Sequence, residues 1–236
     1  MDKPLLDIYA DYLISSFGLT AATGLSRLLQ AHLSHDKITR FLSEKPYTSA
    51  NLWQVVKPLV RQVQNGNAVL VMDDGIAHKP HTDPSELIGW HYDHTTGTSV
   101  KGINFLTTLY CTAEVSLPVA FALVEKNEVF TDKKTGQTKR RATVSKNAYY
   151  QERWQVEVYH KLLKQNASLA CSPTRTKTTQ SIHIFLSLCA YVKLETPKMR
   201  TKCSHFALKQ KLYVAALQAA FSQWQTLQPN NLRMSA

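Results

Sequence analysis

The sequence has 236 residues, of which 44% are hydrophobic and 19% are charged. This composition is close to ordinary globular usage, so it excludes disorder along the whole length, and the length predicts one or two domains. No stretch reaches the ~18 consecutive apolar residues of a membrane span, and the acidic start of the chain is unlike a secretory signal peptide. Without a secretion signal, the four widely spaced cysteines predict reduced thiols in a cytoplasmic protein.

Charge is distributed unevenly along the chain, whose net charge is +11. Residues 1–132 hold 10 basic and 14 acidic residues, a net charge of −4, whereas residues 133–236 hold 18 basic and 3 acidic residues, a net charge of +15. Such a basic half predicts a polyanionic partner, with nucleic acid ahead of an acidic membrane surface.

The first 66 residues are predicted to be helical. Helical spacing of apolar residues covers 5–17 and 21–33, a third helix begins at Ser34 or Asp36, and a fourth covers 51–64. The second and third helices, joined by LSHD, have the arrangement of a DNA-binding helix-turn-helix, although an ordinary helical hairpin gives the same pattern. This region is therefore a possible DNA-binding region.

The period changes after the turn at residues 65–67. Short apolar runs predict strands over 68–72, 102–112 and 119–124, separated by a polar loop over 77–100. The basic stretch 126–148 is predicted to be a solvated hairpin or a disordered connector, and helices follow over 150–165, 180–195 and 204–226. The expected fold class is α+β, with about three strands between helical ends.

Two neighbouring acids end the first predicted strand, Asp73 and Asp74. A carboxylate at the end of a central strand faces the crevice where α/β folds bind ligands. Adjacent strand residues point to opposite faces, so only one of the two acids would face a site. The alternative is a strand-ending turn, because Asp and Gly both favour turns.

A second candidate lies in the helix predicted over 150–165, where Arg153, Glu157, His160 and Lys164 share one helical face. One acid among bases is either a structural ion pair or a metal-binding acid on a surface that also holds phosphates. Loop histidines give a third candidate, a zinc site, from the pairs His78 and His81, and His91 and His94. No cysteine lies close to these pairs, so they do not form a closed four-ligand set. His183 and His205 are instead predicted to be core or interface residues.

The residues Tyr150, Arg153, Glu157 and Lys164 have the spacing of the Tyr-Arg-Glu-Lys signature of bacterial insertion-sequence transposases. The segment VLVMDDGIAHKP also resembles the first catalytic strand of that family, and the stretch from residue 153 to 185 resembles its C-terminal helical region. The resemblance covers nearly the whole chain. It implies an incomplete DDE-class, ribonuclease H-like catalytic domain over residues 67–236, which follows the helical region 1–66 in the sequence.

The resemblance implies roles for individual residues. Asp74, with Asp73 as the alternative, would bind metal together with Glu157 and carry catalysis. The implied DNA contacts are Tyr150, Arg153, Lys161 and Lys164. The implied cofactor is Mg²⁺ or Mn²⁺, and a pair of such ions can activate a nucleophile and stabilise the leaving oxygen in phosphoryl transfer. The implied partners are transposon-end DNA and a second protein chain, either another copy or an intact transposase.

The sequence departs from the family in one respect. The family places a second catalytic Asp on a strand between the first Asp and the Glu, whereas the Asp residues in that interval, Asp83, Asp93 and Asp132, do not end apolar strands. This difference predicts an internal deletion that joins the chain near residues 149–151. The loss of a strand would leave the strand over 69–72 as an exposed apolar edge, and the loss of a carboxylate would leave one metal poorly held.

Two functions remain open from the sequence. In the first, the chain is a transposase-derived protein whose DNA cleavage and strand transfer are impaired. In the second, it is a non-catalytic DNA-binding protein or an inhibitor of an intact transposase. Both would bind phosphates, so metal-dependent cutting is the property that separates them.

Overall fold

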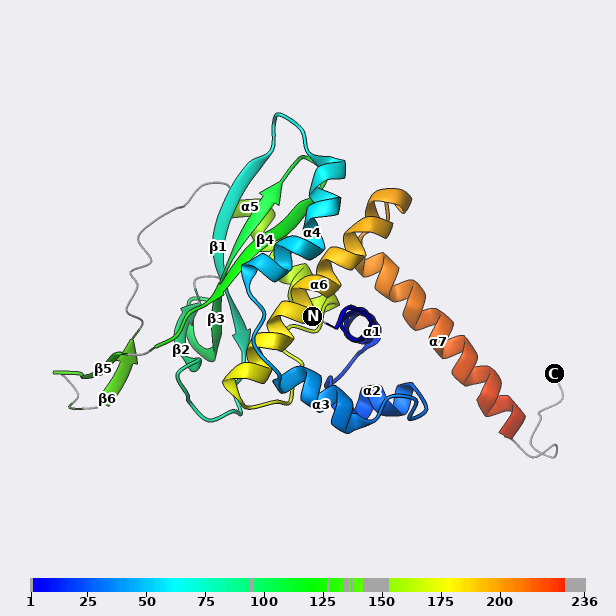
Figure 1. Cartoon of the computed structure of the whole chain (residues 1–236), viewed down its shortest axis with the longest axis horizontal. Coiled ribbons are helices and arrows are strands. Elements are labelled where there is room, and N and C mark those ends of the chain that lie inside the picture. Colours follow the sequence, from blue (N-terminus) through cyan, green and yellow to red (C-terminus); the bar gives the residue numbers. More distant parts are fainter. Residues whose placement is uncertain are drawn as a thin grey trace.

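The computed structural model describes residues 2–93, 96–126, 128–133, 136, 138–141 and 153–227, and for 139–141 and 153–157 it describes the backbone alone (Figure 1). Within these ranges the chain is a mixed α+β structure with a small antiparallel sheet and helices at both ends, as predicted. Tyr150 and the predicted deletion point near residues 149–151 lie outside the described residues.

Seven helices lie within the described ranges. They are α1 (Lys3–Ser15), α2 (Ala22–Leu28), α3 (His35–Ser43), α4 (Ser49–Val63), α5 (Arg153–Asn166), α6 (Lys177–Thr201) and α7 (His205–Leu227). Ser34 caps α3, because its side chain accepts a hydrogen bond from the backbone N–H of Lys37. The second helix was expected to reach residue 33 but is shorter, because Gln30 and Ala31 adopt positive φ angles of 50° and 62°.

The main sheet has four strands within the described ranges, and a separate hairpin follows it. The strands are β1 (Val69–His78), β2 (Ile88–Asp93), β3 (Thr98–Cys111), β4 (Ser116–Leu123), β5 (Glu128–Thr131) and β6 (Thr138–Arg141). All pairs are antiparallel, and β3 is the central strand, with β1 along one side and β2 and β4 along the other. The hairpin β5–β6 lies within the basic stretch 126–148, for which a solvated hairpin was one of the two predicted alternatives.

Two boundaries of the predicted strands were wrong, and one strand was not predicted. The first strand does not end at Asp73 and Asp74 but continues through them to His78. The segment expected to be a polar loop contains β2, which pairs with the first half of β3. Strand β2 ends at Asp93, so one Asp between Asp74 and Glu157 does end a strand, although that strand is partly polar. Pro118 lies inside β4, where the register with β3 shifts after Thr108, so the missing backbone donor is accommodated at an irregularity in the ladder.

Strand β1 lies at the edge of the sheet among the described strands, because β3 is its single strand neighbour there. Three of its apolar side chains, Val69, Leu70 and Met72, are exposed, and Leu70 retains 70% of its accessible surface. Among the described strands, β1 therefore has an unpaired edge and carries exposed apolar side chains. Such an edge favours pairing with another chain unless a partner covers it.

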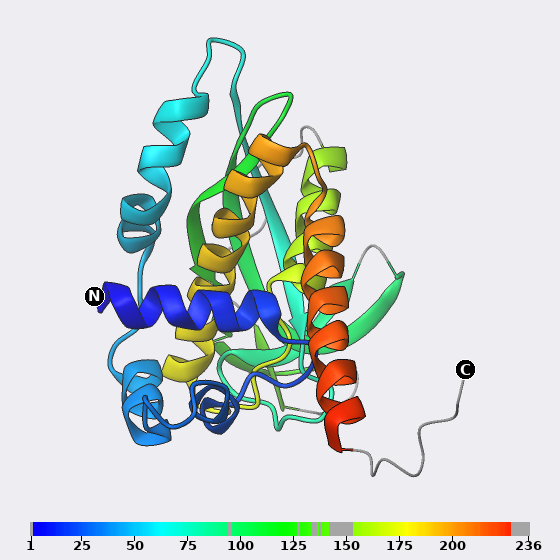
Figure 2. The ribbon, with the colours of Figure 1, turned by 90° about the vertical axis from the view of Figure 1, so that its right-hand side faces the viewer.

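Helix α6 forms the centre of the core. Its residues from Thr179 to Val192 are all buried, which is typical of a helix that is packed on every side. Helix α1 crosses α6 on the side away from the sheet, and α5 and α7 lie beside it (Figure 2). His183 is buried within α6, and its Nε2 lies 3.0 Å from the carbonyl oxygen of Ser168, so the prediction of a core histidine is confirmed.

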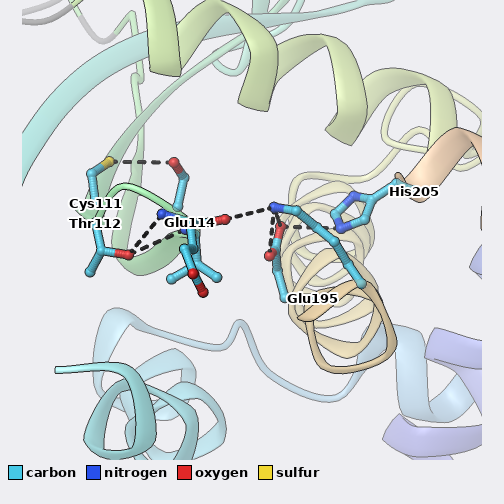
Figure 3. Close-up of polar contacts among 8 residues, drawn as sticks. Cys111, Thr112, Glu114, Glu195 and His205 are labelled. Atoms are coloured by element: carbon cyan, nitrogen blue, oxygen red, sulfur yellow. Dashed lines mark hydrogen bonds and ion pairs between the residues drawn. The ribbon is translucent and has the colours of Figure 1, made fainter. Parts of the chain in front are cut away.

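A buried polar cluster joins α6 to α7 (Figure 3). His205 at the start of α7 is also a core histidine, and its Nε2 lies 3.1 Å from Oε1 of the fully buried Glu195. Lys198 donates to both carboxylate oxygens of Glu195, at 3.2 and 3.0 Å, and to the carbonyl oxygen of Glu114 at 3.3 Å. Both carboxylate oxygens of Glu195 therefore accept a hydrogen bond from Lys198, which offsets the cost of burying this charge.

The four cysteines are free thiols, as predicted. A search of the described helices found none that combines the length and the apolar character needed to cross a bilayer.

Candidate active site

The two candidate acids lie side by side in the middle of β1, on opposite faces. Asp73 is paired in register with Thr107 of β3, and Asp74 with Leu106. Because residues two apart on a strand share a face, Asp73 lies on the face of Gly75. A Cβ atom on Gly75 would come within 2.6 Å of the His160 ring, so the missing side chain is what lets α5 pack this closely against β1.

His160 of α5 lies over this face of β1, close to Asp73. Its Nε2 lies 3.7 Å from Oδ2 of Asp73. Burial and, to a smaller extent, the positive charge of Lys164 lower the pKa of His160, and the carboxylate of Asp74 opposes them; together they bring this pKa to about 4. The imidazole is therefore neutral at pH 7, and its contact with Asp73 is not an ion pair between two charges.

Asp74 is held from the neighbouring strand by Asn104. The amide nitrogen Nδ2 of Asn104 donates a hydrogen bond of 2.9 Å to Oδ2 of Asp74. Asn104 is fully buried, and its main-chain carbonyl oxygen accepts from the backbone N–H of Val124, which follows β4. Asn104 was not predicted from the sequence, although an amide within the apolar run GINFLTTLY was a visible signal.

The other predicted residues lie on α5 or outside the described part. Glu157 lies one turn before His160, in a helix that packs against β1, and Arg153 begins that helix; for both the structure describes the backbone alone. Lys161 is exposed, and Lys164 is half-buried. The structure thus brings helix α5 against the strand that carries the two acids.

The donors present fit a hard cation in type. Carboxylate oxygens are the ligands that Mg²⁺ prefers, and Asp73 and Asp74 supply them from β1. Among the described side chains, no group of three or more His, Cys, Asp or Glu residues is arranged to hold a metal ion. The same search gives no support to the zinc alternative at His78, His81 and His91, and His94 lies outside the described residues.

A comparison with models of protein families identifies the family of this chain. The family model described as DDE superfamily endonuclease matches residues 3–169, well over half of the chain. The chain belongs to this family. The match spans the N-terminal helices, the whole sheet and α5, so both strand acids and Glu157 lie inside it.

Membership of the DDE superfamily carries a coarse statement of chemistry. Its endonucleases act on DNA and generally depend on divalent metal ions, which agrees with the carboxylates on β1. No curated protein and no solved structure matched the chain.

Proposed function

We propose that the chain is a transposase-derived protein that binds transposon-end DNA and whose cleavage and strand-transfer activity is impaired. The observation that carries this proposal is the match to the DDE superfamily endonucleases over residues 3–169. It is supported by the basic half of the chain, since DNA is the polyanion on which this superfamily acts.

The proposed metal site takes Asp74 from β1 and Glu157 from α5. Asn104 fixes the carboxylate of Asp74, and residues that bind metals are commonly oriented by such a hydrogen bond. Asp73 is kept as the alternative ligand, because it lies on the face of β1 that α5 covers. Asp73 also contacts His160. A bound Mg²⁺ or Mn²⁺ would stabilise the negative charge on the attacking and leaving oxygens of a phosphoryl transfer.

Impaired activity follows from the incomplete ligand set. Asp93 ends the mixed, partly polar strand β2, but no Asp between Asp74 and Glu157 ends an apolar strand, and we attribute this to an internal deletion near residues 149–151. The exposed edge of β1 supports that proposal, because a strand removed by such a deletion would have covered this edge. Two carboxylates in place of three hold one of two metal ions poorly.

A second candidate function is supported by the same edge. An unpaired strand edge can accept a strand from another chain, so β1 offers a surface for a second copy or for an intact transposase. In this role the chain would occupy DNA ends or join a transposase without cutting. Addition of the chain to an active family member would then reduce strand transfer in proportion to the amount added.

DNA binding is proposed to use Tyr150, Arg153, Lys161 and Lys164, and salt titration tests it. Binding to duplex DNA is expected to weaken steeply as salt is raised, because contacts to phosphates release counterions. The double substitution of Lys161 and Lys164 by Gln is expected to lower the slope of log Kd against log salt by about 2. The matched control is Lys45→Gln, an exposed lysine in the acidic half, which is expected to leave the slope unchanged. An unchanged slope in the double variant would contradict the assignment.

Removing the Asn104 amide is expected to weaken metal binding. Asn104→Leu keeps a similar volume but removes the donor that orients Asp74, and loss of such a partner costs about 10–100-fold in metal affinity. Mn²⁺ binding by calorimetry measures the change, and circular dichroism establishes that the variant is folded. Thr108→Val, on the same strand and face, is the control. Equal Mn²⁺ affinity in folded Asn104→Leu and wild type would show that Asn104 does not orient a metal ligand.

A further inference from the structure

A cavity of about 450 Å³ lies between the end of α5, the segment after α1 and the first turns of α7. Neither Asp73 nor Asp74 lines it. Figure 2 shows α7 running beside α5, with the end of α1 reaching it. The volume lies within the ~300–1,000 Å³ of ordinary ligand sites. Its lining residues include two lysines and three aromatic residues but no acid.

The aromatic residues of this cavity are unusually exposed. Phe17, Phe206 and Tyr213 keep 60%, 64% and 45% of their accessible surface, and the rings of Phe17 and Tyr213 lie 5.1 Å apart. Exposed rings beside cationic side chains are the arrangement on which proteins stack unpaired nucleobases. The apolar part of the cavity therefore favours a flat aromatic ligand.

The lysines give the cavity a positive end. Lys209 is largely buried; its Nζ lies 5.2 Å from the ring centroid of Phe17 and donates to the carbonyl oxygen of Gln165 at 3.3 Å. An ammonium group has three donors, so this contact leaves capacity for an anion. Lys164 lines the same cavity, and together the two ammonium groups favour a ligand that carries phosphate.

A third group points independently to a ligand. Asn166 lines the cavity and is 1% exposed, yet its amide nitrogen Nδ2 has no hydrogen-bond partner within the described part of the chain. An unsatisfied buried donor is costly, and a bound acceptor would remove that cost. The carbonyl or ring nitrogen of a nucleobase is such an acceptor.

We propose that this cavity binds a single unstacked nucleotide. The base stacks on the exposed rings, Asn166 donates to the base edge, and Lys164 and Lys209 hold the phosphate. The nucleotide is either a free mononucleotide or the unpaired end of a DNA strand, and the second source rests on the proposed function.

Two probes test the proposal by binding alone, so the assay needs neither a metal ion nor DNA cleavage. The first is etheno-adenosine monophosphate, whose emission falls on stacking, and the second is a labelled 5′-phosphorylated single-stranded oligonucleotide. Wild-type protein is expected to bind at least one of them saturably. Phe206→Ala is expected to weaken that binding about fivefold or more, and Lys209→Met likewise.

The helix α7 provides matched controls. Phe221 is 62% exposed and Lys211 is also exposed, and neither lines the cavity, so Phe221→Ala and Lys211→Met are expected to bind as wild type does. Binding of the mononucleotide would identify the free ligand as a source, and Phe206-dependent binding of the oligonucleotide alone would identify the strand end. Failure of both probes, or equal weakening in the controls, would overturn the proposal. If Lys209→Met does not fold, Phe206→Ala still decides the proposal, because Phe206 is exposed and its substitution does not disturb the core.

Discussion

Glu195→Gln is expected to lower the free energy of unfolding by about 2–3 kcal/mol at pH 7. The carboxylate is fully buried between α6 and α7, where it contacts His205 at 3.1 Å and accepts two hydrogen bonds from Lys198 (Figure 3). The amide keeps the shape of the side chain but removes the charge that these partners require. Urea unfolding followed by circular dichroism measures the change.

The loss depends on pH in a defined direction. Burial alone would raise the pKa of Glu195, but the contacts with His205 and Lys198 outweigh it and lower the pKa below its ordinary value. A lowered pKa in the folded state contributes stability above the unfolded pKa of ~4.3, and that contribution decreases as pH falls through the folded pKa. The difference between wild type and Glu195→Gln is therefore expected to be constant from about pH 5 to 7 and to narrow in more acidic solution.

An exposed acid provides the control. Glu114 lies 3.8 Å from Lys202 on the surface, and Glu114→Gln is expected to change stability by less than about 0.5 kcal/mol. If both variants have the same stability at pH 7, the buried cluster does not hold α7 against α6.

Gly102→Ala is expected to lower the free energy of unfolding by about 2 kcal/mol. Gly102 lies on the central strand β3, opposite His78 of β1 and Gly89 of β2. An added Cβ would collide with the carbonyl oxygen of Ala77 and lie 2.8 Å from Cγ2 of Ile76. A backbone atom cannot move aside as a flexible side chain does, so β1 and β3 must separate locally.

The matched control is Gly66→Ala, in the turn between α4 and β1, where an added Cβ meets nothing within 4 Å. The urea midpoints of the two variants should differ clearly, with the Gly66 variant close to wild type. Similar midpoints would mean that the sheet accommodates the added methyl group, contrary to the close approach of β1 and β3.

Local periodicity was enough to predict the helices and the fold class. The apolar spacing in α1, α3 and α4 and the Ser34 cap are short-range features, and the structure confirms them. Helix α6 was predicted to end at residue 195 but continues to Thr201 through Pro197. The extra turns include Lys198, which contacts the buried Glu195. Pro197 locally disfavours a helix, so the sequence predicted an earlier end, whereas in the structure the helix continues and Lys198 makes a tertiary contact.

The candidate site was harder to predict because it depends on contacts between distant segments. Asp73, Asp74 and Gly75 have the composition of a turn, yet β3 pairs with them as a strand and α5 packs over Gly75. Strand β2 was missed because its polar side chains match a loop, whereas its pairing comes from β3. Asn104 was missed because its role depends on a hydrogen bond across two strands to Asp74.

The central claim is that the chain binds DNA but does not cut it unaided. The most direct test is Mn²⁺-dependent nicking of a plasmid that carries the DNA flanking this gene, with wild type compared with Glu157→Gln. Both proteins are expected to bind the plasmid, and neither is expected to nick it above the level seen without protein. Nicking by wild type that Glu157→Gln abolishes would contradict the proposed function, because the carboxylates present would then be enough for cleavage.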